Sequence, residues 1–335
     1  MKTSRMETLS DRYHAQFTSQ AQPFGSSGAF TLPESAENEL RLVTLESAWM
    51  MENITLQDVE QQSGQAVYVG DSSLHTGRAI QGRFYKPLSV NGTPYTLVET
   101  DSCASLPYDR MSMVANIGDF AHFNQTVDDF FGQAIALDVL RVGLNGTRTA
   151  YPTNPTENPK GEDVNKGWHT LAKEYEDGQQ VLTRPVTLGA GGDFPHLDAL
   201  ASHLITTLIP EGMRENPRLV VMVGAELAAA ERLRLFNAAD RPSDIAAAAQ
   251  MVNSSVAGRF AFIPPFMPGK RLAITTLENL HVYTLKGSRI FRAEFVEDRA
   301  SYERSYLRYE GYGLGDATLY AAVDESAISF IPAQK

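Results

Sequence analysis

The sequence has little cysteine, no excess of positive charge and no long apolar run, and each shortage excludes a class of protein. The single cysteine, Cys103, has no partner for an intramolecular disulfide and excludes a cysteine-rich zinc site. Acidic residues outnumber basic residues by 40 to 29, and the net charge of -11 is opposite to that of a protein that grips nucleic-acid phosphates. No segment approaches the ~18 consecutive apolar residues of a membrane span, and the first residues lack the apolar core of a signal peptide. We therefore expect a protein of the reducing cytoplasm that binds neither membranes nor specific nucleic acids.

Motifs of common catalytic and nucleotide-binding sites are also missing, among them Gly-x-Ser-x-Gly, His-Glu-x-x-His, Gly-x-x-x-x-Gly-Lys-Ser/Thr and Cys-x-x-Cys. The glycine-rich stretch 189–193 precedes a predicted helix, where backbone N–H groups could hold a phosphate, but it lacks the lysine and hydroxyl of a P-loop. We expect a tight turn in which Asp193 caps a helix that begins at Pro195. Cys103 has no base near it in the sequence, so we expect it to be a small buried apolar side chain.

Two sets of titratable residues have a spacing that deserves testing against chemistry. His196 and His203 could share one face of a helix, but two histidines without a third ligand make a poor metal site. Asp128, Asp129 and Asp138 lie on a long predicted helix, where solvated acids are commoner than a catalytic pair of carboxylates. The sequence therefore predicts no catalytic, cofactor-binding or metal-binding residue.

The N-terminal third of the chain changes character twice. The first 36 or so residues mix polar residues with glycine and predict a mobile arm, and residues 36–51 predict a short, partly buried helix. Residues 66–113 contain β-type runs, and Asn91-Gly92 is a strong signal for a hairpin. The residues between these strands are mostly polar, so the hairpin is either a loose excursion or has its partner on another chain.

A long helix is predicted over residues 117–141, about 38 Å at 1.5 Å per residue. Apolar residues recur along it at steps of three and four, as on a helix that packs against a sheet or another helix. This stripe consists of Phe120, Phe123, Val127, Phe130, Ala134 and Leu137, and it is widened by Phe131, Ile135 and Leu140.

The remainder of the chain predicts an α/β region that returns to strands. Helices are expected over residues 195–208, 225–235 and 244–251, and strands over 219–223, 260–263, 272–276, 281–284, 290–296 and 319–323. A chain of 335 residues with 43% hydrophobic residues is long and apolar enough to bury a core, in roughly two domains. The fold class is therefore expected to be α+β.

Several ordered motifs follow the long helix, and their succession is more specific than any one of them. They are Gly143-Leu144-Asn145-Gly146, Thr153-Asn154-Pro155, Asn158-Pro159, Asp163-Val164-Asn165-Lys166-Gly167-Trp168, Gly191-Gly192-Asp193 with Leu197-Asp198-Ala199-Leu200, Leu219-Val220-Val221-Met222-Val223-Gly224, and Thr276-Leu277-Glu278-Asn279-Leu280 with His281-Val282-Tyr283. The succession resembles the major capsid proteins of P2-like tailed bacteriophages, and the resemblance extends from about Phe30 to Val323. It implies the HK97-like capsid fold.

In the terms of that fold, the resemblance implies four consecutive parts. Residues 1–35 would be an N-terminal arm, and residues 36–188 the first part of a peripheral domain, with an E-loop hairpin (66–113) and a spine helix (117–141). Residues 189–277 would be an α/β axial domain, and residues 278–335 the strands that return to the peripheral domain. In P2-like capsids the arm is removed by a scaffold-linked protease, which places the corresponding junction here near Phe30-Thr31.

The function implied is assembly: many copies would form the hexamers and pentamers of an icosahedral head shell around the double-stranded DNA genome of a tailed phage. A scaffold/protease protein and a portal would be partners, together with a possible decoration protein, and assembly would take place in the cytoplasm of the host bacterium. Two alternatives stay open from the residues alone. A phage tail tube or sheath subunit would form stacked rings or helical tubes, and an enzyme with a site of scattered residues would turn over substrate as a purified monomer.

Overall fold

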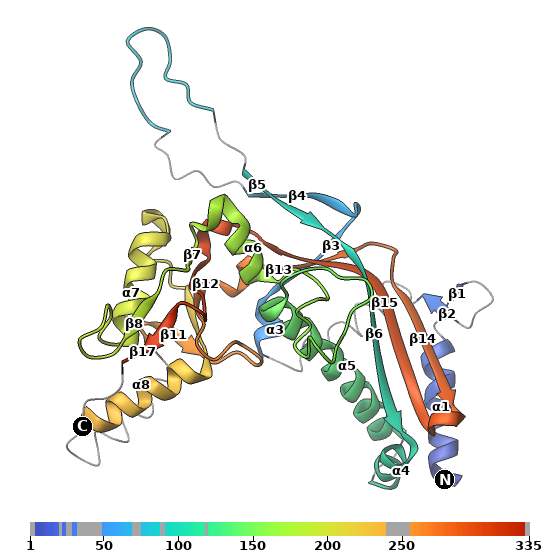
Figure 1. Cartoon of the computed structure of the whole chain (residues 1–335). Helices are drawn as coiled ribbons and strands as arrows, with labels where there is room; N and C mark the ends of the chain where they lie inside the picture. The colour runs from blue at the N-terminus through green and yellow to red at the C-terminus, as the bar shows by residue number, and fades with distance from the viewer. Residues whose placement is uncertain are drawn as a thin grey trace. The chain divides into compact units, whose positions relative to one another are not determined.

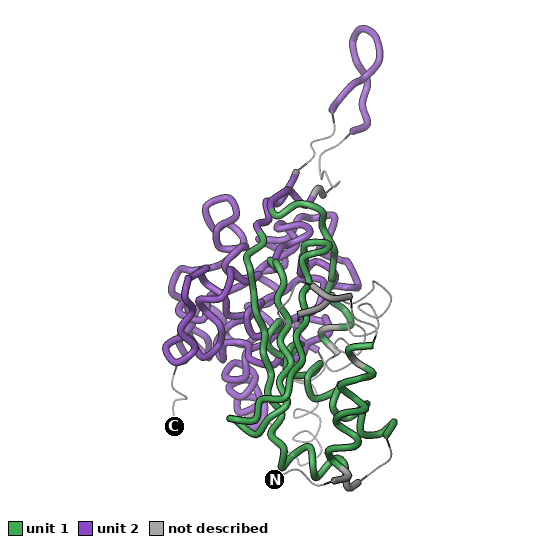
Figure 2. The backbone as a smooth tube through the Cα atoms, turned by 90° about the vertical axis from the view of Figure 1, so that its right-hand side faces the viewer, with its two compact units in different colours: residues 1–62, 97–140, 283–311 green, residues 63–96, 141–282, 312–335 purple. Residues whose placement is uncertain are grey.

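The chain divides into two compact units, each assembled from separated stretches of sequence (Figure 2). Unit 1 comprises residues 1–62, 97–140 and 283–311, and unit 2 comprises residues 63–96, 141–282 and 312–335. The computed structural model describes residues 4–19, 22–24, 29–31, 49–68, 75–87, 91–117, 120–238 and 255–331. Both units therefore combine residues from the two halves of the chain.

Unit 1 contains most of a long sheet with the strand order β1-β2-β14-β15-β13-β3, in which β6 also pairs with β15 (Figure 1). β15, Ser301–Leu314, pairs antiparallel with β14 on one side and with β6 over ten residues on the other. The other strands are β1 (Gln22–Phe24), β2 (Ala29–Thr31), β3 (Thr55–Val59), β6 (Val98–Pro107), β13 (Leu280–Leu285) and β14 (Ile290–Val296). β15 therefore pairs with other strands along both of its edges.

The sequence pattern missed β15, because several of its buried residues are charged. Arg308 and Glu310 are both buried, and the guanidinium donates two hydrogen bonds to the carboxylate, at 2.7 and 2.9 Å. Arg304 is buried and donates to Asp128 on helix α5 (Phe120–Asn145) at 2.8 Å. Since these charges are paired inside the fold, the alternation of apolar and polar residues does not mark the buried face.

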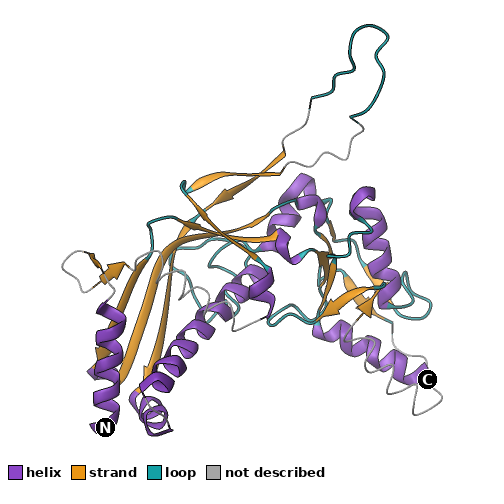
Figure 3. Cartoon of the chain, turned by 180° about the vertical axis from the view of Figure 1, so that it is seen from behind, coloured by secondary structure: helices purple, strands orange, loops and turns teal. Residues whose placement is uncertain are grey.

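Residues 4–19 form a helix in the region where the sequence predicted a mobile arm. α1, Ser4–Ser19, buries Met6, Leu9 and Tyr13, which recur at steps of three and four. Their side chains join one apolar core with α4 (Tyr108–Ile117), α5 and the sheet, and Figure 3 shows these helices beside the strands. The hydroxyl of Tyr13 accepts from Arg304 at 2.6 Å and donates to Asp128. Burial raises the pKa of the Tyr13 hydroxyl well above its ordinary value. The polar composition of α1 concealed this short apolar stripe.

The long helix is confirmed, with its ends shifted and its buried face rotated. α5 runs over Phe120–Asn145, compared with the predicted residues 117–141. Phe123 and Val127 are buried as expected, but Phe131 is 1% exposed while Phe130 is 44% exposed. The predicted stripe included Phe130. The buried face of the helix instead follows the residues that were predicted to widen that stripe, such as Phe131.

The predicted hairpin is present, but Asn91-Gly92 is not its turn. β4 (Ser63–Tyr68) pairs antiparallel with β5 (Asn91–Thr96), from Ser63↔Thr96 to Tyr68↔Asn91, and the two strands form a sheet of their own. Asn91 and Gly92 therefore lie at the start of a strand, and the connection between the strands spans residues 69–90. The predicted helix over 36–51 lies mostly outside the described residues, and α3, Trp49–Asn53, begins where they resume.

Unit 2 is built on an α/β sheet with the strand order β10-β11-β9-β12-β16-β7. Its apolar core includes fully buried Leu200, Leu204, Val221, Leu272 and Val323. The strands are β7 (Val181–Leu182), β9 (Val220–Val223), β10 (Ser255–Val256), β11 (Arg259–Phe262), β12 (Leu272–Thr275) and β16 (Ala321–Val323), and β8 (Val186–Leu188) pairs separately with β17 (Ile328–Phe330). The α-helices in the described part of this unit include α6 (Trp168–Glu174), α7 (Leu197–Leu208) and α8 (Ala225–Ala238).

The helices and strands predicted for this unit are confirmed to within a few residues, where the structure describes them. The expected helix over residues 244–251 lies outside the described residues. Within the described ranges, no helix combines the length and the apolar character needed to cross a bilayer.

Candidate functional site

The end of α5 packs against the start of α6 through three glycines. Gly146 N donates to Val142 O at 2.7 Å, and Gly167 N donates to Gly146 O at 3.0 Å. A Cβ atom on Gly146 would overlap the backbone oxygen of Asn165, and one on Gly143 would overlap the ring of Trp168. The spacing of the motifs after the long helix is therefore a packing requirement: two backbone segments touch where no side chain fits.

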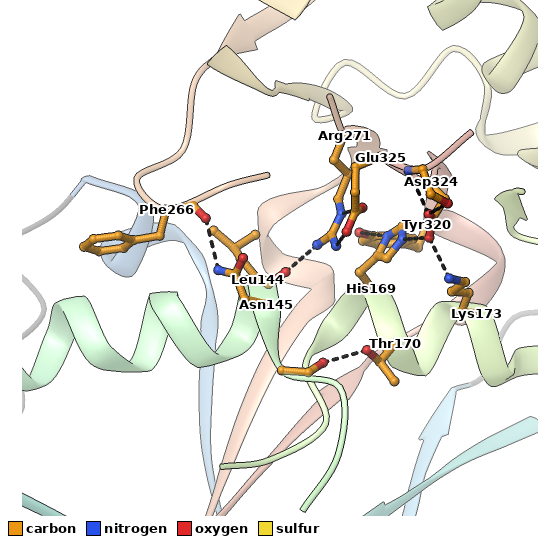
Figure 4. A network of polar contacts seen from close by, with 12 residues as sticks. Leu144, Asn145, His169, Thr170, Lys173, Phe266, Arg271, Tyr320, Asp324 and Glu325 are labelled. Atoms are coloured by element: carbon orange, nitrogen blue, oxygen red, sulfur yellow. Dashed lines mark hydrogen bonds and ion pairs between the residues drawn. The ribbon is translucent and has the colours of Figure 1, made fainter. Parts of the chain in front are cut away.

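Polar side chains secure the same junction (Figure 4). Asn145 Nδ2 donates to Arg141 O at 2.9 Å and to Phe266 O at 3.0 Å, so it closes the last turn of α5 and holds a distant loop. Thr170 Oγ1 donates to Gly146 O at 2.6 Å. These bonds tie the end of α5 to the loop at Phe266 and to α6.

A network of charged residues joins α6, β12 and the turn after β16 in unit 2 (Figure 4). Asp324 Oδ2 lies 3.3 Å from His169 Nε2 and accepts from Lys173 Nζ at 2.6 Å. Arg271 donates through Nε and Nη2 to the two oxygens of Glu325, at 2.8 Å each, and its Nη1 also donates to Leu144 O at the end of α5. Each carboxylate in the network therefore already has a cation.

The protonation states follow from these partners. The hydrogen bond with His169, reinforced by Lys173 and Ser326 and opposed by burial, holds the pKa of Asp324 well below its ordinary value. Burial raises the pKa of Glu325, but the Arg271 guanidinium and the Glu325 backbone N–H act against it, and the pKa lies below its ordinary value. Burial lowers the pKa of His169, although Asp324 opposes the shift. At neutral pH the two acids are ionised and the imidazole is neutral.

His169, Asp324 and Glu325 also have the spacing of a metal site, since their ligand atoms lie within 4.8 Å of one another. A divalent ion there would compete with Lys173 and Arg271, which already hold the carboxylates. The donor set therefore fits an ion-pair clamp between chain segments better than a metal site. Sequence analysis missed this network, although His169 and Lys173 are four residues apart on one helix, a spacing that brings side chains together.

We expect the change Asp324→Asn to lower the free energy of unfolding by about 2 kcal/mol, because it weakens a buried charge-assisted hydrogen bond. The Lys173 side chain is 44% exposed, so solvent screens its ion pair with Asp324 and limits the loss. Because folding lowers the pKa of Asp324, its contribution is present above the ordinary pKa near 3.8 and is lost as the pH falls below that value. Urea unfolding at pH 7 and pH 3 measures both effects, and the variant should lose less stability in acid than the wild type. Glu174→Gln is the control, because it affects only an exposed pair with Lys166 and should change stability by less than about 0.5 kcal/mol. An unchanged stability of Asp324→Asn at pH 7 would contradict the clamp.

The residues that the sequence singled out for chemistry have other roles. Residues 189–193 form the expected tight turn, in which Gly192 N donates to Gly189 O at 3.0 Å. Asp193 does not cap α7: it accepts from Thr187 N at 2.8 Å and from Thr187 Oγ1 at 2.7 Å, and these bonds lower its pKa. The cap of α7 is His196, whose Nδ1 accepts from Ala199 N at 3.1 Å.

The other residues that were considered for chemistry lie in different surroundings. The ring of His203 packs beside Phe194. Asp128 pairs with Arg304, whereas Asp129 and Asp138 are exposed. Cys103 was expected to be buried, but it is exposed on β6. Exposure alternates along β6, and Cys103 lies in its exposed row with Glu99, Asp101 and Ser105.

A family model described as "Phage major capsid protein, P2 family" matches residues 8–326. The chain belongs to this family. Similar proteins include the capsid proteins of Escherichia phage P2, 25% identical over 304 residues that cover 85% of each chain. The major capsid protein of Serratia phage KSP20 is 23% identical over 84% of this chain and 86% of its own.

A solved structure has the same fold. It is that of the satellite phage P4 procapsid including its size determination (Sid) protein, with a TM-score of 0.73 and 21% identity over 97% of this chain and 98% of that chain. The HK97-like α+β fold predicted from the sequence is thereby confirmed. The family match confirms the interpretation as a major capsid protein. This capsid protein is a subunit of the shell of a virion, which is built by homo-oligomeric assembly. The matches do not support the alternative of a tail subunit.

The capsid protein also carries an exposed hairpin connection. In its described part, residues 75–87, Ile80 is fully exposed, Tyr85 is 84% exposed and Phe84 is 42% exposed. Arg78 and Arg83 lie beside them in the sequence and are exposed as well. The tip therefore presents apolar and positively charged side chains to solvent, which is typical of a surface that acquires a partner.

Proposed function

We propose that this capsid protein acts by assembly alone, as hexamers and pentamers that close into an icosahedral head, and that none of its residues catalyses a reaction. The observation that carries the proposal is the family match over residues 8–326. The pairing of Asp324 and Glu325 with cations supports it, because the group with the spacing of a metal site in the described part holds chain segments together.

The hairpin is proposed as the part of the subunit that reaches a neighbouring copy. Among the strands that the structure describes, β4 and β5 pair only with each other, so the hairpin adds no strand to the larger sheets. The segment 70–100 contains Arg78, Arg83 and Lys86 against Asp71 and Glu99, a slight positive charge on a chain whose net charge is -11. Charge complementarity favours contact between such a loop and the acidic surface of another copy.

The partners and the domain names belong to the same proposal. A scaffold/protease protein and a portal would act during assembly in the host cytoplasm, and a decoration protein would bind the finished shell. Residues 189–277 would form the axial domain, and residues 36–188 and 278–335 the peripheral domain. The arm, residues 1–35, includes α1, so a cut near Phe30-Thr31 would remove Met6 and Tyr13 from a core to which they contribute.

Co-expression with the scaffold protein of its phage should yield closed particles or ring-shaped capsomers. Negative-stain microscopy and sedimentation velocity measure this result directly. Stacked rings or helical tubes would favour a tail component instead. A monomer at every concentration, with and without the scaffold, would contradict the proposal.

A further inference from the structure

The loop between α5 and α6, residues 146–167, has a backbone held at several points, although most of its side chains lie at the surface. Thr147 N donates to Glu162 O at 2.8 Å, and Ala150 N donates to Asp163 O at 2.8 Å. The two ends of the loop therefore lie against each other in the manner of an Ω-loop. Residues 147–157 are nevertheless exposed, except for half-buried Ala150.

A buried carboxylate fixes the outer part of this loop. Asp163 is 2% exposed, and its Oδ2 accepts from Asn154 N at 2.6 Å. The side-chain oxygen of Asn154 then accepts from Thr156 N at 3.1 Å and Glu157 N at 3.3 Å. Three prolines further restrict the backbone, at Pro152, Pro155 and Pro159. The ordering of the loop is thus completed within the subunit.

The loop holds one large aromatic side chain out into solvent. Tyr151 is 99% exposed, next to Pro152. Residues 147–156 contain no acidic residue and one basic residue, Arg148, whereas the whole chain has 40 acidic and 29 basic residues. A rigid tyrosine loses little conformational freedom on binding, and tyrosines are enriched among residues that dominate binding energy. The apex therefore suits an acidic partner surface.

We infer that residues 147–156 form a pre-organised contact surface for a second copy of the chain, with Tyr151 as its anchor and Arg148 as its charged neighbour. The inference rests on the proposed function, because the shell supplies a second copy whose excess of acidic residues complements this apex. It adds a contact separate from the hairpin, carried by the motifs that follow α5.

The test compares Tyr151→Ala, Arg148→Glu and the control Lys160→Ala, an exposed residue at the other end of the loop. Each variant is assembled with scaffold, and the critical concentration for particle formation is measured by sedimentation. We expect an increase of about tenfold or more for Tyr151→Ala, as for a central tyrosine of an interface, and a clear increase for Arg148→Glu. Lys160→Ala should assemble like the wild type, and all three should keep the wild-type melting temperature.

A photo-crosslinking residue in place of Tyr151 identifies the partner in assembled particles. A crosslink between two copies of the chain, located by peptide mapping, would support the inference. Two results would overturn it while leaving the proposed function intact. One is a crosslink only to a different protein, and the other is an unchanged critical concentration for Tyr151→Ala under conditions in which the wild type assembles. A large loss of melting temperature in Tyr151→Ala would also overturn it, since the ring would then support its own subunit. Wild-type chains that form no particles at all would overturn both.

Discussion

Replacing residues 69–90 with a short Gly/Ser linker is expected to give a folded subunit that no longer forms closed particles. The replaced segment lies between β4 and β5, and its described tip presents Ile80 and Tyr85 to solvent, so its loss removes no known core contact. Assembly would lose this area and its positive charge at every subunit contact. The cut must end before Leu97, which is 1% exposed and whose N–H donates to Gln62 O at 2.8 Å.

Circular dichroism and the melting temperature test the fold of the deletion variant, and negative-stain microscopy with sedimentation tests assembly. A variant in which residues 69–90 are scrambled is the matched control, because it keeps length, composition and charge. It should fold like the deletion variant and recover little assembly if the order of side chains matters. Normal shells from the deletion variant, or an unfolded subunit, would contradict the role given to the hairpin.

Gly146→Ala should lower the free energy of unfolding by about 3 kcal/mol or more, and soluble capsid protein should decrease with it. The added Cβ would overlap Asn165 O and lie 2.8 Å from Val142 O and 2.9 Å from Gly167 N. All three are backbone atoms, so no side-chain rotation relieves the clash, and the junction between α5 and α6 must open. The midpoint of urea unfolding measures the loss.

Gly212→Ala is the matched control for this experiment, because an added Cβ there meets no atom within 4 Å. It makes the same chemical change in a short 3-10 turn, Glu211–Met213, and should leave the unfolding midpoint within about 0.5 kcal/mol of the wild type. Equal midpoints for Gly146→Ala and the wild type would show that the backbone can separate at little cost, and the packing account of the motif would fail.

Elements with clear apolar periodicity were predictable from the sequence. α5 and α7 bury regularly spaced apolar residues, and β9 and β12 are short continuous apolar runs. The structure contains each of them near its predicted bounds. It is harder to predict which residues of a helix face the core than to predict that the helix has an apolar face. Phe130 and Phe131 are adjacent and equally apolar, and only the position of the sheet and of α1 decides that Phe131 is buried.

Elements stabilised by paired charges were not predictable in this way. β15 can bury Arg304 and Arg308 because each has an acidic partner. The partner of Arg304 lies on helix α5, and the partner of Arg308 lies two residues further along the same strand. The network around Asp324 depends on contacts between residues more than 150 positions apart, His169 and Asp324 among them. The ordered family motifs identified the fold, but they could not show which glycine or acid performs which structural task.

The exposed side chain of Cys103 provides a chemical handle for counting. Because the chain has one thiol, a maleimide dye gives at most one fluorophore per subunit, with no need to engineer cysteines in or out. Partial burial and the nearby carboxylates of Glu303 and Asp101 raise the pKa of this thiol, so labelling is fastest at mildly alkaline pH. Subunits labelled to completion before assembly would make the brightness of a single particle proportional to its copy number, which reports the triangulation number of the shell.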